Sequence, residues 1–164
     1  MSKLITDWQN RPQAVLNKKK KWLPKLKQHS GKRLDRWVNE LDRAVFTEID
    51  CLDCANCCTS IPPIVTMNDA KRLAKHLNLS KDAFFEKYLI KDEDGDTVIN
   101  QSPCPFLQSD NKCAVYDERP TACRQYPHTG TSDFSKNLEL HFQNSVYCPA
   151  VFHILERMDK AGTF

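Results

Sequence analysis

The clearest periodic pattern in the chain is an amphipathic helix that leads directly into a group of cysteines. Apolar residues recur at intervals of three and four over residues 33–49, which is the spacing of one helical face. A second helix is predicted over residues 13–27, where apolar positions are mixed with the lysine run 18–21. We therefore expect residues 1–48 to form a basic helical extension that packs on a core domain made by residues 49–164.

Two further helices follow the cysteine group, and each begins with a capping residue. Thr66 and Asp69 have the spacing of a capping box, in which a hydroxyl and a carboxylate satisfy the first backbone N–H groups of a helix. Ser80 is expected to cap the second helix, which buries Phe84 and its aromatic neighbours. Both helices are expected to be scaffold.

Short apolar runs predict a few β pieces between the helices. Residues 97–99 are expected to pair with residues 114–116, and residues 138–142 are expected to form a further strand. A final helix is predicted to open at Cys148 and Pro149, because proline suits the first position of a helix. The expected fold class is mainly α with short β-hairpin pieces.

Cysteine is the residue whose placement points to chemistry. Four of the eight cysteines lie within residues 51–58 in the pattern C-x2-C-x2-C-C. Each of the eight is expected at a turn or a helix start, whereas a cysteine used as a small core residue falls inside an apolar periodicity. Thiolates two residues apart can hold Zn²⁺ or an iron–sulfur cluster. We therefore predict a small, irregular, metal-stapled domain with eight metal ligands: Cys51, Cys54, Cys57, Cys58, Cys104, Cys113, Cys123 and Cys148.

The number and the kind of metal sites stay open at this point. Eight thiols suffice for two four-thiolate sites, or for one site with spare thiols. Cys148-Pro149 supplies a remote Cys-Pro, as in a bacterial ferredoxin, but the C-x2-C-C ending departs from the ferredoxin spacing. No signal segment and no apolar run of membrane-spanning length is present. We expect a cytoplasmic protein with no membrane contact, in which thiols stay reduced and available to metal.

Two arginines and three histidines are the remaining candidates. Arg119 and Arg124 lie near the seventh cysteine, and guanidinium groups there would offset the negative charge of a thiolate cluster. We predict that both contribute to cofactor binding. His128 is an alternative metal ligand, whereas His141 and His153 are expected to be structural.

Charge divides the chain unevenly. The net charge is +3, but residues 1–48 hold 12 Lys/Arg against 5 Asp/Glu, and residues 49–164 hold 12 against 16. A lysine run of this kind can attract nucleic acid or an acidic protein. Because no interleaved aromatic residues and no nucleic-acid motif accompany it, we interpret it as a solvated helix face, and nucleic acid is not the expected partner.

The combined cysteine pattern resembles a known family. The residues that carry it are Cys51-x2-Cys54-x2-Cys57-Cys58, Cys104-Pro105-Phe106-Leu107, Cys113-Ala114-Val115-Tyr116, Arg119-Pro120-x2-Cys123-Arg124-x-Tyr126-Pro127 and Cys148. Over about residues 49–150 the chain is similar to the YkgJ-type cysteine-cluster family, the CxxCxxCC zinc- or iron-chelating domain. The resemblance implies a bound zinc ion or iron–sulfur cluster. Flagellin lysine methylases share a similar cluster, so the resemblance keeps an enzyme in view.

Three functions follow from these observations. The preferred one is a metal-binding protein that holds zinc or an iron–sulfur cluster, with the metal ion as its partner. The second is an iron–sulfur oxidoreductase or a methyltransferase-like enzyme that uses the cluster. The absence of a Gly-rich nucleotide loop and of a C-x3-C-x2-C motif argues against it. The third is a nucleic-acid or protein adaptor that binds through the basic N-terminus.

Overall fold

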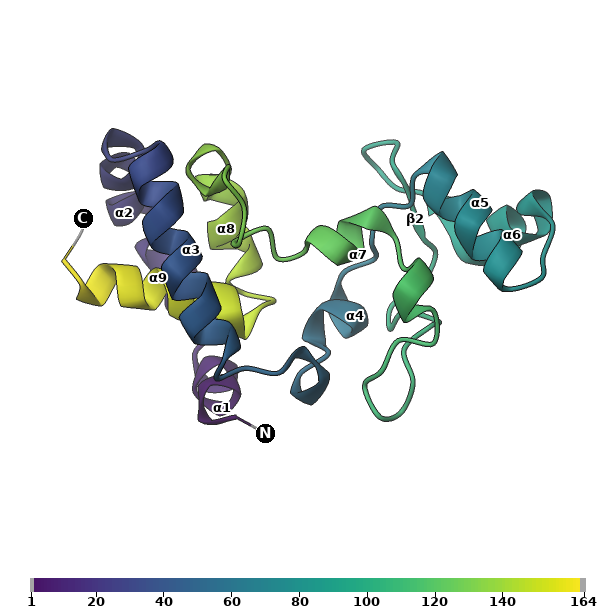
Figure 1. The fold of residues 1–164 in the computed structure, drawn as a ribbon, viewed down its shortest axis with the longest axis horizontal. Helices are drawn as coiled ribbons and strands as arrows, with labels where there is room; N and C mark the ends of the chain where they lie inside the picture. The colour runs from purple at the N-terminus through teal and green to yellow at the C-terminus, as the bar shows by residue number, and fades with distance from the viewer. Residues whose placement is uncertain (1, 163–164) are drawn as a thin grey trace. The chain divides into compact units, whose positions relative to one another are not determined.

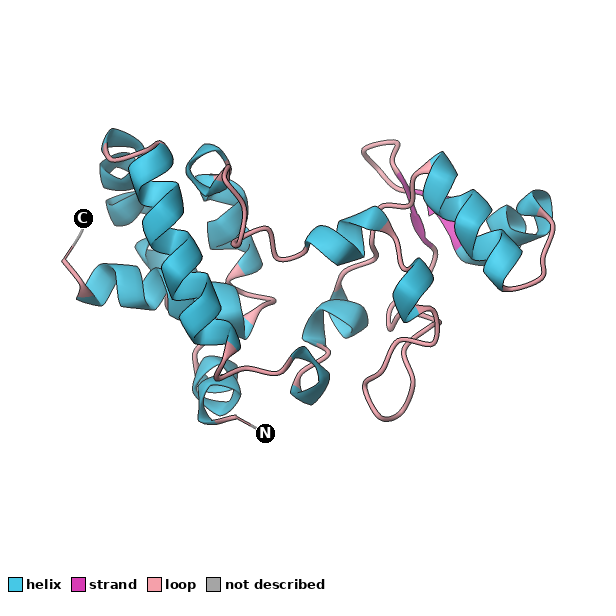
Figure 2. Ribbon diagram, in the orientation of Figure 1, coloured by secondary structure: helices cyan, strands magenta, loops and turns pink. Residues whose placement is uncertain are grey.

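The computed structural model describes residues 2–162, and its architecture is mainly helical. Nine α-helices and one two-strand antiparallel hairpin lie in these residues, so the predicted fold class is confirmed. Figure 2 shows the predominance of helix. Two compact units share the chain. Unit 1 combines the residues up to Cys54 with those from Pro127 onwards, and unit 2 is Ala55–Tyr126.

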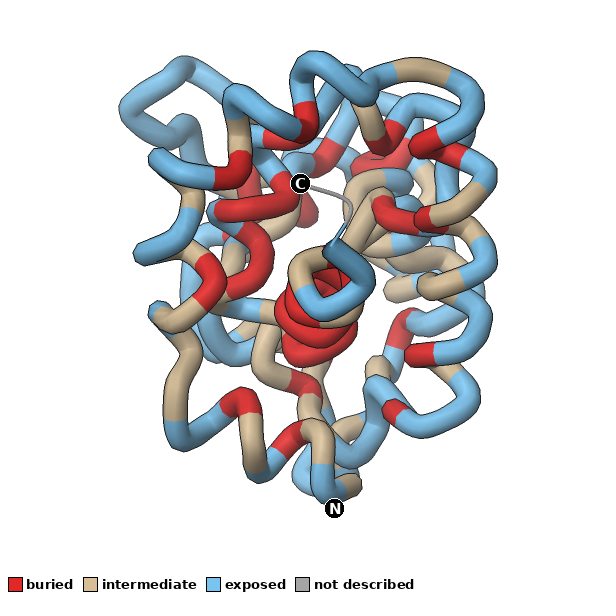
Figure 3. The backbone as a smooth tube through the Cα atoms, turned by 90° about the vertical axis from the view of Figure 1, so that its left-hand side faces the viewer, coloured by how far each residue is buried: buried red, intermediate tan, exposed pale blue. Residues whose placement is uncertain are grey.

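Unit 1 is a helical assembly around the last helix. Its helices, labelled in Figure 1, are α1 (Lys3–Asn10), α2 (Lys19–Gln28), α3 (Lys32–Phe46), α8 (Leu138–Asn144) and α9 (Pro149–Lys160), with 3-10 turns at Leu16–Lys18, Cys51–Asp53 and Phe134–Lys136. Most residues of α9 are buried (Figure 3), because α1, α3 and α8 all pack against it. The first part of the chain therefore shares one hydrophobic core with the last.

The periodicity of α3 places its apolar face as predicted, although the helix ends at Phe46 and not at Ile49. The helix α1 was not expected from the sequence. The predicted strand at 138–142 is wrong, since these residues lie in α8. The physical reason is that buried residues recur at intervals of three and four, as on one face of a helix. Leu138, His141 and Phe142 are buried, whereas the residues between them are exposed.

Unit 2 combines short helices with a small hairpin. Its elements are α4 (Asn56–Ser60), α5 (Met67–His76), α6 (Lys81–Tyr88), β1 (Leu89–Lys91), β2 (Thr97–Ile99), a 3-10 turn at Tyr116–Glu118 and α7 (Thr121–Gln125). A second hydrophobic cluster, centred on Leu73, Phe84 and Phe106, holds α5, α6 and the hairpin together. Both predicted caps are confirmed. The Thr66 hydroxyl accepts from the Asp69 amide at 3.1 Å, and the Ser80 hydroxyl accepts from the Ala83 amide at 3.2 Å.

The predicted pairing of residues 97–99 with residues 114–116 is wrong. The strand β2 pairs with β1 in an antiparallel register, with Leu89 opposite Ile99. The acidic turn between them is closed by Gly95 at φ 85°, a backbone conformation that glycine adopts without strain. The strand β2 therefore pairs with β1, which is joined to it by a short turn, and not with the more distant residues 114–116, because a short loop costs less entropy to close.

None of the helices in residues 2–162 is long and apolar enough to span a membrane. The predicted division into a basic helical extension 1–48 and a cysteine-cluster domain 49–164 stays a prediction.

Candidate metal centres

Four cysteines from separate segments of unit 2 form one group. Cys58 lies on α4 and Cys123 on α7, while Cys104 and Cys113 lie at the two ends of a short loop. The amide nitrogen of Cys104 donates to the carbonyl oxygen of Cys58 at 2.8 Å. Burial, followed by the charges of Cys58, Cys104 and Cys113, raises the pKa of Cys123, so these three thiols lie within electrostatic range of it. We call these four residues the unit 2 thiol set.

The loop that presents Cys104 and Cys113 also supplies hydrogen-bond donors to their sulfurs. Leu107 and Cys113 form an antiparallel bridge that closes the loop. Burial raises the pKa of Cys104 and of Cys113, and backbone N–H groups of Phe106 and Leu107 on Cys104, and of Val115 on Cys113, partly offset this rise. Donors that point at sulfur stabilise the thiolate, which is the form that binds metal.

The pKa values of the unit 2 thiol set differ: that of Cys58 is lowered, and those of the other three thiols are raised. A hydrogen bond with Cys57, whose sulfur lies 4.0 Å away, lowers the pKa of Cys58 to about 7 against the effect of burial. Burial, together with the charge of neighbouring thiolates, raises the pKa of Cys104 and Cys113, and raises that of Cys123 to about 12. Four thiolates therefore form together only beside a positive charge, and metal binding there would release protons.

Arg119 supplies part of that positive charge. Its guanidinium lies 3.8 Å from the centre of the Tyr116 ring and donates to the Tyr116 carbonyl at 2.5 Å. From this position its charge partly offsets the rise that burial causes in the pKa of Cys113 and Cys123. Arg124 donates instead to the carbonyl oxygens of Asp117 and Arg119, so it holds the loop. Direct cofactor binding by either arginine stays a prediction.

A buried carboxylate fastens the helix of Cys123 to α5. Asp69 is 1% exposed and accepts from the amide and hydroxyl of Thr121 at 3.1 and 2.9 Å, and from Arg72 at 2.8 Å. Burial acts to raise its pKa, but hydrogen bonds from Thr66, Arg72 and Thr121 outweigh burial and lower it to about 2. The sequence predicted Asp69 only as a cap, because no local spacing signals a partner 52 residues away.

A second group of cysteines lies in unit 1. Cys51 opens the 3-10 turn Cys51–Asp53 and Cys54 is its C-cap, whose amide donates to the Cys51 carbonyl at 3.1 Å. Cys148 is the N-cap of α9, as predicted, and it packs with Cys54 on the core of this unit. Burial and the charges of Cys51 and Cys54 raise the pKa of Cys148 to about 12, while the amides of Ala150 and Val151 act in the opposite direction. We call these three residues the unit 1 thiol set.

The C-x2-C-x2-C-C stretch thus contributes to both sets. Residues 51–58 are not one continuous helix, because Ala55 adopts φ 47° between the 3-10 turn and α4. Cys57 belongs to unit 2 and contacts Cys58. All eight cysteines lie in the described part of the chain, and none of them forms a disulfide there. Their role as ligands stays a prediction, and Cys57 is the one that no set includes.

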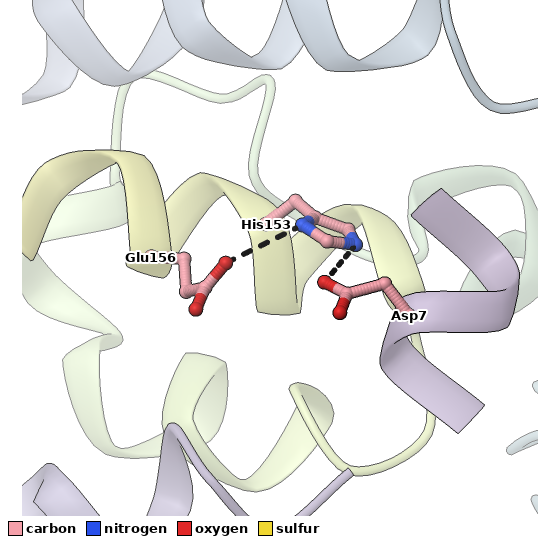
Figure 4. Close-up of side chains that lie close together, drawn as sticks. All are labelled: Asp7, His153 and Glu156. Carbon is pink, nitrogen blue, oxygen red and sulfur yellow. Dashed lines mark ion pairs between the residues drawn. The ribbon is translucent and has the colours of Figure 1, made fainter. Parts of the chain in front are cut away.

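The histidines of unit 1 occupy other surroundings. His128, the alternative ligand, is half-buried with φ 68°, and burial lowers its pKa. His141 is fully buried and stacks on Phe134 at 4.1 Å. His153 lies between Asp7 and Glu156, as Figure 4 shows, and the three side chains have ligand atoms within 4.8 Å of one another.

The arrangement around His153 is an ion-pair network and not a free ligand set. Its Nε2 lies 2.8 Å from the carbonyl oxygen of Leu4, which only accepts, so this nitrogen carries a proton. Arg11 binds Asp7 through two nitrogens at 2.6 and 3.1 Å and binds Glu156 at 2.6 Å. The carboxylates are thus neutralised already, and a cation would have to displace a guanidinium. Sequence reasoning missed Asp7, Arg11 and Glu156.

Sulfur-only donor sets presented on turns and helix ends fit a thiophilic cation such as zinc or iron. The fold and these sets define a mainly helical cysteine-cluster protein. The family "CxxCxxCC: putative zinc- or iron-chelating domain" matches residues 50–149, and the chain belongs to it. No curated protein and no solved structure matches the chain.

Proposed function

We propose that this protein is a thiolate metal chelator with two centres, one in each unit. The observation that carries the proposal is the sorting of the cysteines into two groups, each assembled from segments distant in the sequence. The unit 2 thiol set would hold one centre through four sulfurs. The unit 1 thiol set would supply three sulfurs to the other.

The surroundings of the sulfurs support metal and not a passive core role. In each set at least one thiol, Cys104 or Cys148, has a pKa raised by burial and also receives backbone N–H groups that favour the thiolate, so a cation nearby would promote its ionisation. Zinc bound there would contribute its binding free energy to folding, and an iron–sulfur cluster would also accept and return an electron. Arg119 would lower the net negative charge of the unit 2 centre.

The proposal includes a cytoplasmic location, where thiols stay reduced. It assigns no separate partner to the lysine run 18–21. Lys18 pairs with Asp159 at 3.3 Å and Lys19 with Glu139 at 3.4 Å, so part of the run is used inside unit 1.

Single cysteine substitutions test the two-centre arrangement. Cys104→Ser should remove the metal of one centre, Cys148→Ser that of the other, and the double variant both, as measured by elemental analysis of anaerobically purified protein. Cys57→Ser tests whether Cys57 belongs to either centre, because this variant should lower the metal content of one centre only or of neither. If Cys104→Ser and Cys148→Ser each removed all the metal, a single shared site would replace the two centres. Full metal content in both variants would refute chelation by these cysteines.

A further inference from the structure

We propose that the N-terminal helix α1 is a positioning element of the unit 1 thiol set, with Trp8 and Arg11 as its positioning residues. This inference rests on the proposed function and adds a role for residues that lie outside the region matched by the family. It concerns how Cys148 is held, and it leaves the ligands themselves unchanged.

The first contact lies before Cys148 in the sequence. Trp8 is buried, and its indole Nε1 donates to the carbonyl oxygen of Ser145 at 3.0 Å. The Ser145 hydroxyl donates in turn to the Phe142 carbonyl at 2.6 Å, and the Cys148 amide donates to the Asn144 carbonyl at 2.8 Å. The chain that delivers Cys148 is therefore fixed by buried hydrogen bonds that begin on α1.

The second group of contacts lies after Cys148, on α9. The protonated Nε2 of His153 donates to the carbonyl oxygen of Leu4 at 2.8 Å. Arg11 joins Asp7 on α1 to Glu156 on α9, two helices that face each other in Figure 4. Glu156 is 6% exposed, so removing Arg11 would leave a buried carboxylate without its strongest partner.

A third contact joins α9 to the segment of the other two cysteines. Arg157 binds Glu48 at 2.6 Å, three residues before Cys51. The helix that carries Cys148 at its N-cap is thus held on one side by α1 and on another by the chain that enters the 3-10 turn of Cys51 and Cys54. Removing direct hydrogen-bond partners of metal ligands typically changes metal affinity by about 10- to 100-fold, and these contacts act one step further from the sulfurs, so we expect the low end of that range.

The expected effect is a selective loss of affinity at one centre. Zinc serves as the probe, because it binds thiolate sites whichever metal the cell supplies. In Arg11→Gln, competition with a chelator should show one of the two zinc ions bound about tenfold more weakly, and the other unchanged. Lys27→Gln is the matched control in the same unit, since it removes an ion pair with Glu139 that does not involve α1 or α9. Arg11→Lys, which keeps the charge, should fall between wild type and Arg11→Gln.

A second readout uses the metal-free protein, so that failure of this inference is distinguishable from failure of the proposed function. Cys148 should be alkylated faster in Arg11→Gln than in wild type, as followed by peptide mass spectrometry, while Cys104 should react at an unchanged rate. Equal weakening of both zinc ions, or no change in either affinity or alkylation, would overturn the inference. If wild type bound no zinc, the proposed function would fail, and the alkylation rates would still decide whether α1 positions Cys148.

Discussion

Replacing His141 by leucine tests whether a buried imidazole makes unit 1 sensitive to acid. The ring is 0% exposed and lies parallel to Phe134, with an interplanar angle of 6°. Within the described residues, neither of its nitrogens has a hydrogen-bond partner of normal geometry. Burial, followed by the charge of His128, lowers the pKa of His141 to about 4, and the Phe134 backbone acts weakly in the opposite direction. The neutral form is therefore strongly favoured in the folded protein.

The direction of the pH effect follows from the order of the two pKa values. The folded pKa lies below the value of 6.5 for an unperturbed histidine, so the unfolded chain takes up the proton first as the pH falls. The stability linked to this group is fully present above about pH 6.5 and is lost progressively towards pH 4. A shift of this size corresponds to about 3 kcal/mol in the free energy of unfolding.

Tryptophan fluorescence during urea unfolding measures this effect in unit 1, because Trp8, Trp22 and Trp37 all lie there. His141→Leu should lose less stability than wild type between pH 6.5 and 4, by about 3 kcal/mol. Substituting the exposed His29 by glutamine is the control and should leave the wild-type slope unchanged. If His141→Leu kept the wild-type loss over this range, the buried imidazole would not be the acid-sensitive group and the reasoning would fail.

Two further predictions concern one buried carboxylate and one exposed carboxylate. Asp69→Asn should lower the free energy of unfolding of unit 2 by about 2–4 kcal/mol at neutral pH, because five donated hydrogen bonds converge on a buried anion. Since the folded pKa of Asp69 is lowered to about 2, the stability difference between wild type and Asp69→Asn should shrink as the pH falls from 3.8 to 2. Circular dichroism during unfolding would measure this difference. A stability difference that did not change with pH would contradict the role given to the Asp69 carboxylate. Glu139→Gln removes two exposed lysine pairs and should leave Tm unchanged at any salt concentration; a salt-dependent drop would show that these pairs hold the fold.

Local patterns predicted what depends on neighbouring residues. The caps at Thr66 and Ser80 and the opening of α9 at Cys148 were predicted because each depends on residues within one helical turn. The α3 face was predicted for the same reason. The helix α1 was missed, because its packing on α9 stabilises it more than intrinsic propensity does.

Long-range pairings were beyond local patterns. The strand predicted at 138–142 was wrong because a short apolar run fits both the strand period of two and the helix period of about 3.6. Burial of one helical face favours the helix at these residues. The two thiol sets could not be read from spacing either. Cys51 and Cys58 are close in sequence, but the left-handed Ala55 sends them to different units. Asp69 and Arg11 act through partners 52 and 145 residues away, for which one sequence carries no signal.

The most direct test of the two-centre account is the metal and sulfide content of anaerobically purified wild-type protein, measured together with its visible spectrum and its count of reactive thiols. The account predicts two filled centres per chain, and it predicts that the thiols of the two sets become reactive only after a chelator is added. Two zinc ions in a colourless protein, or iron with matching sulfide and broad visible absorption, both fulfil it and identify the metal. A metal-free protein whose eight thiols all react at once in the folded state would contradict it.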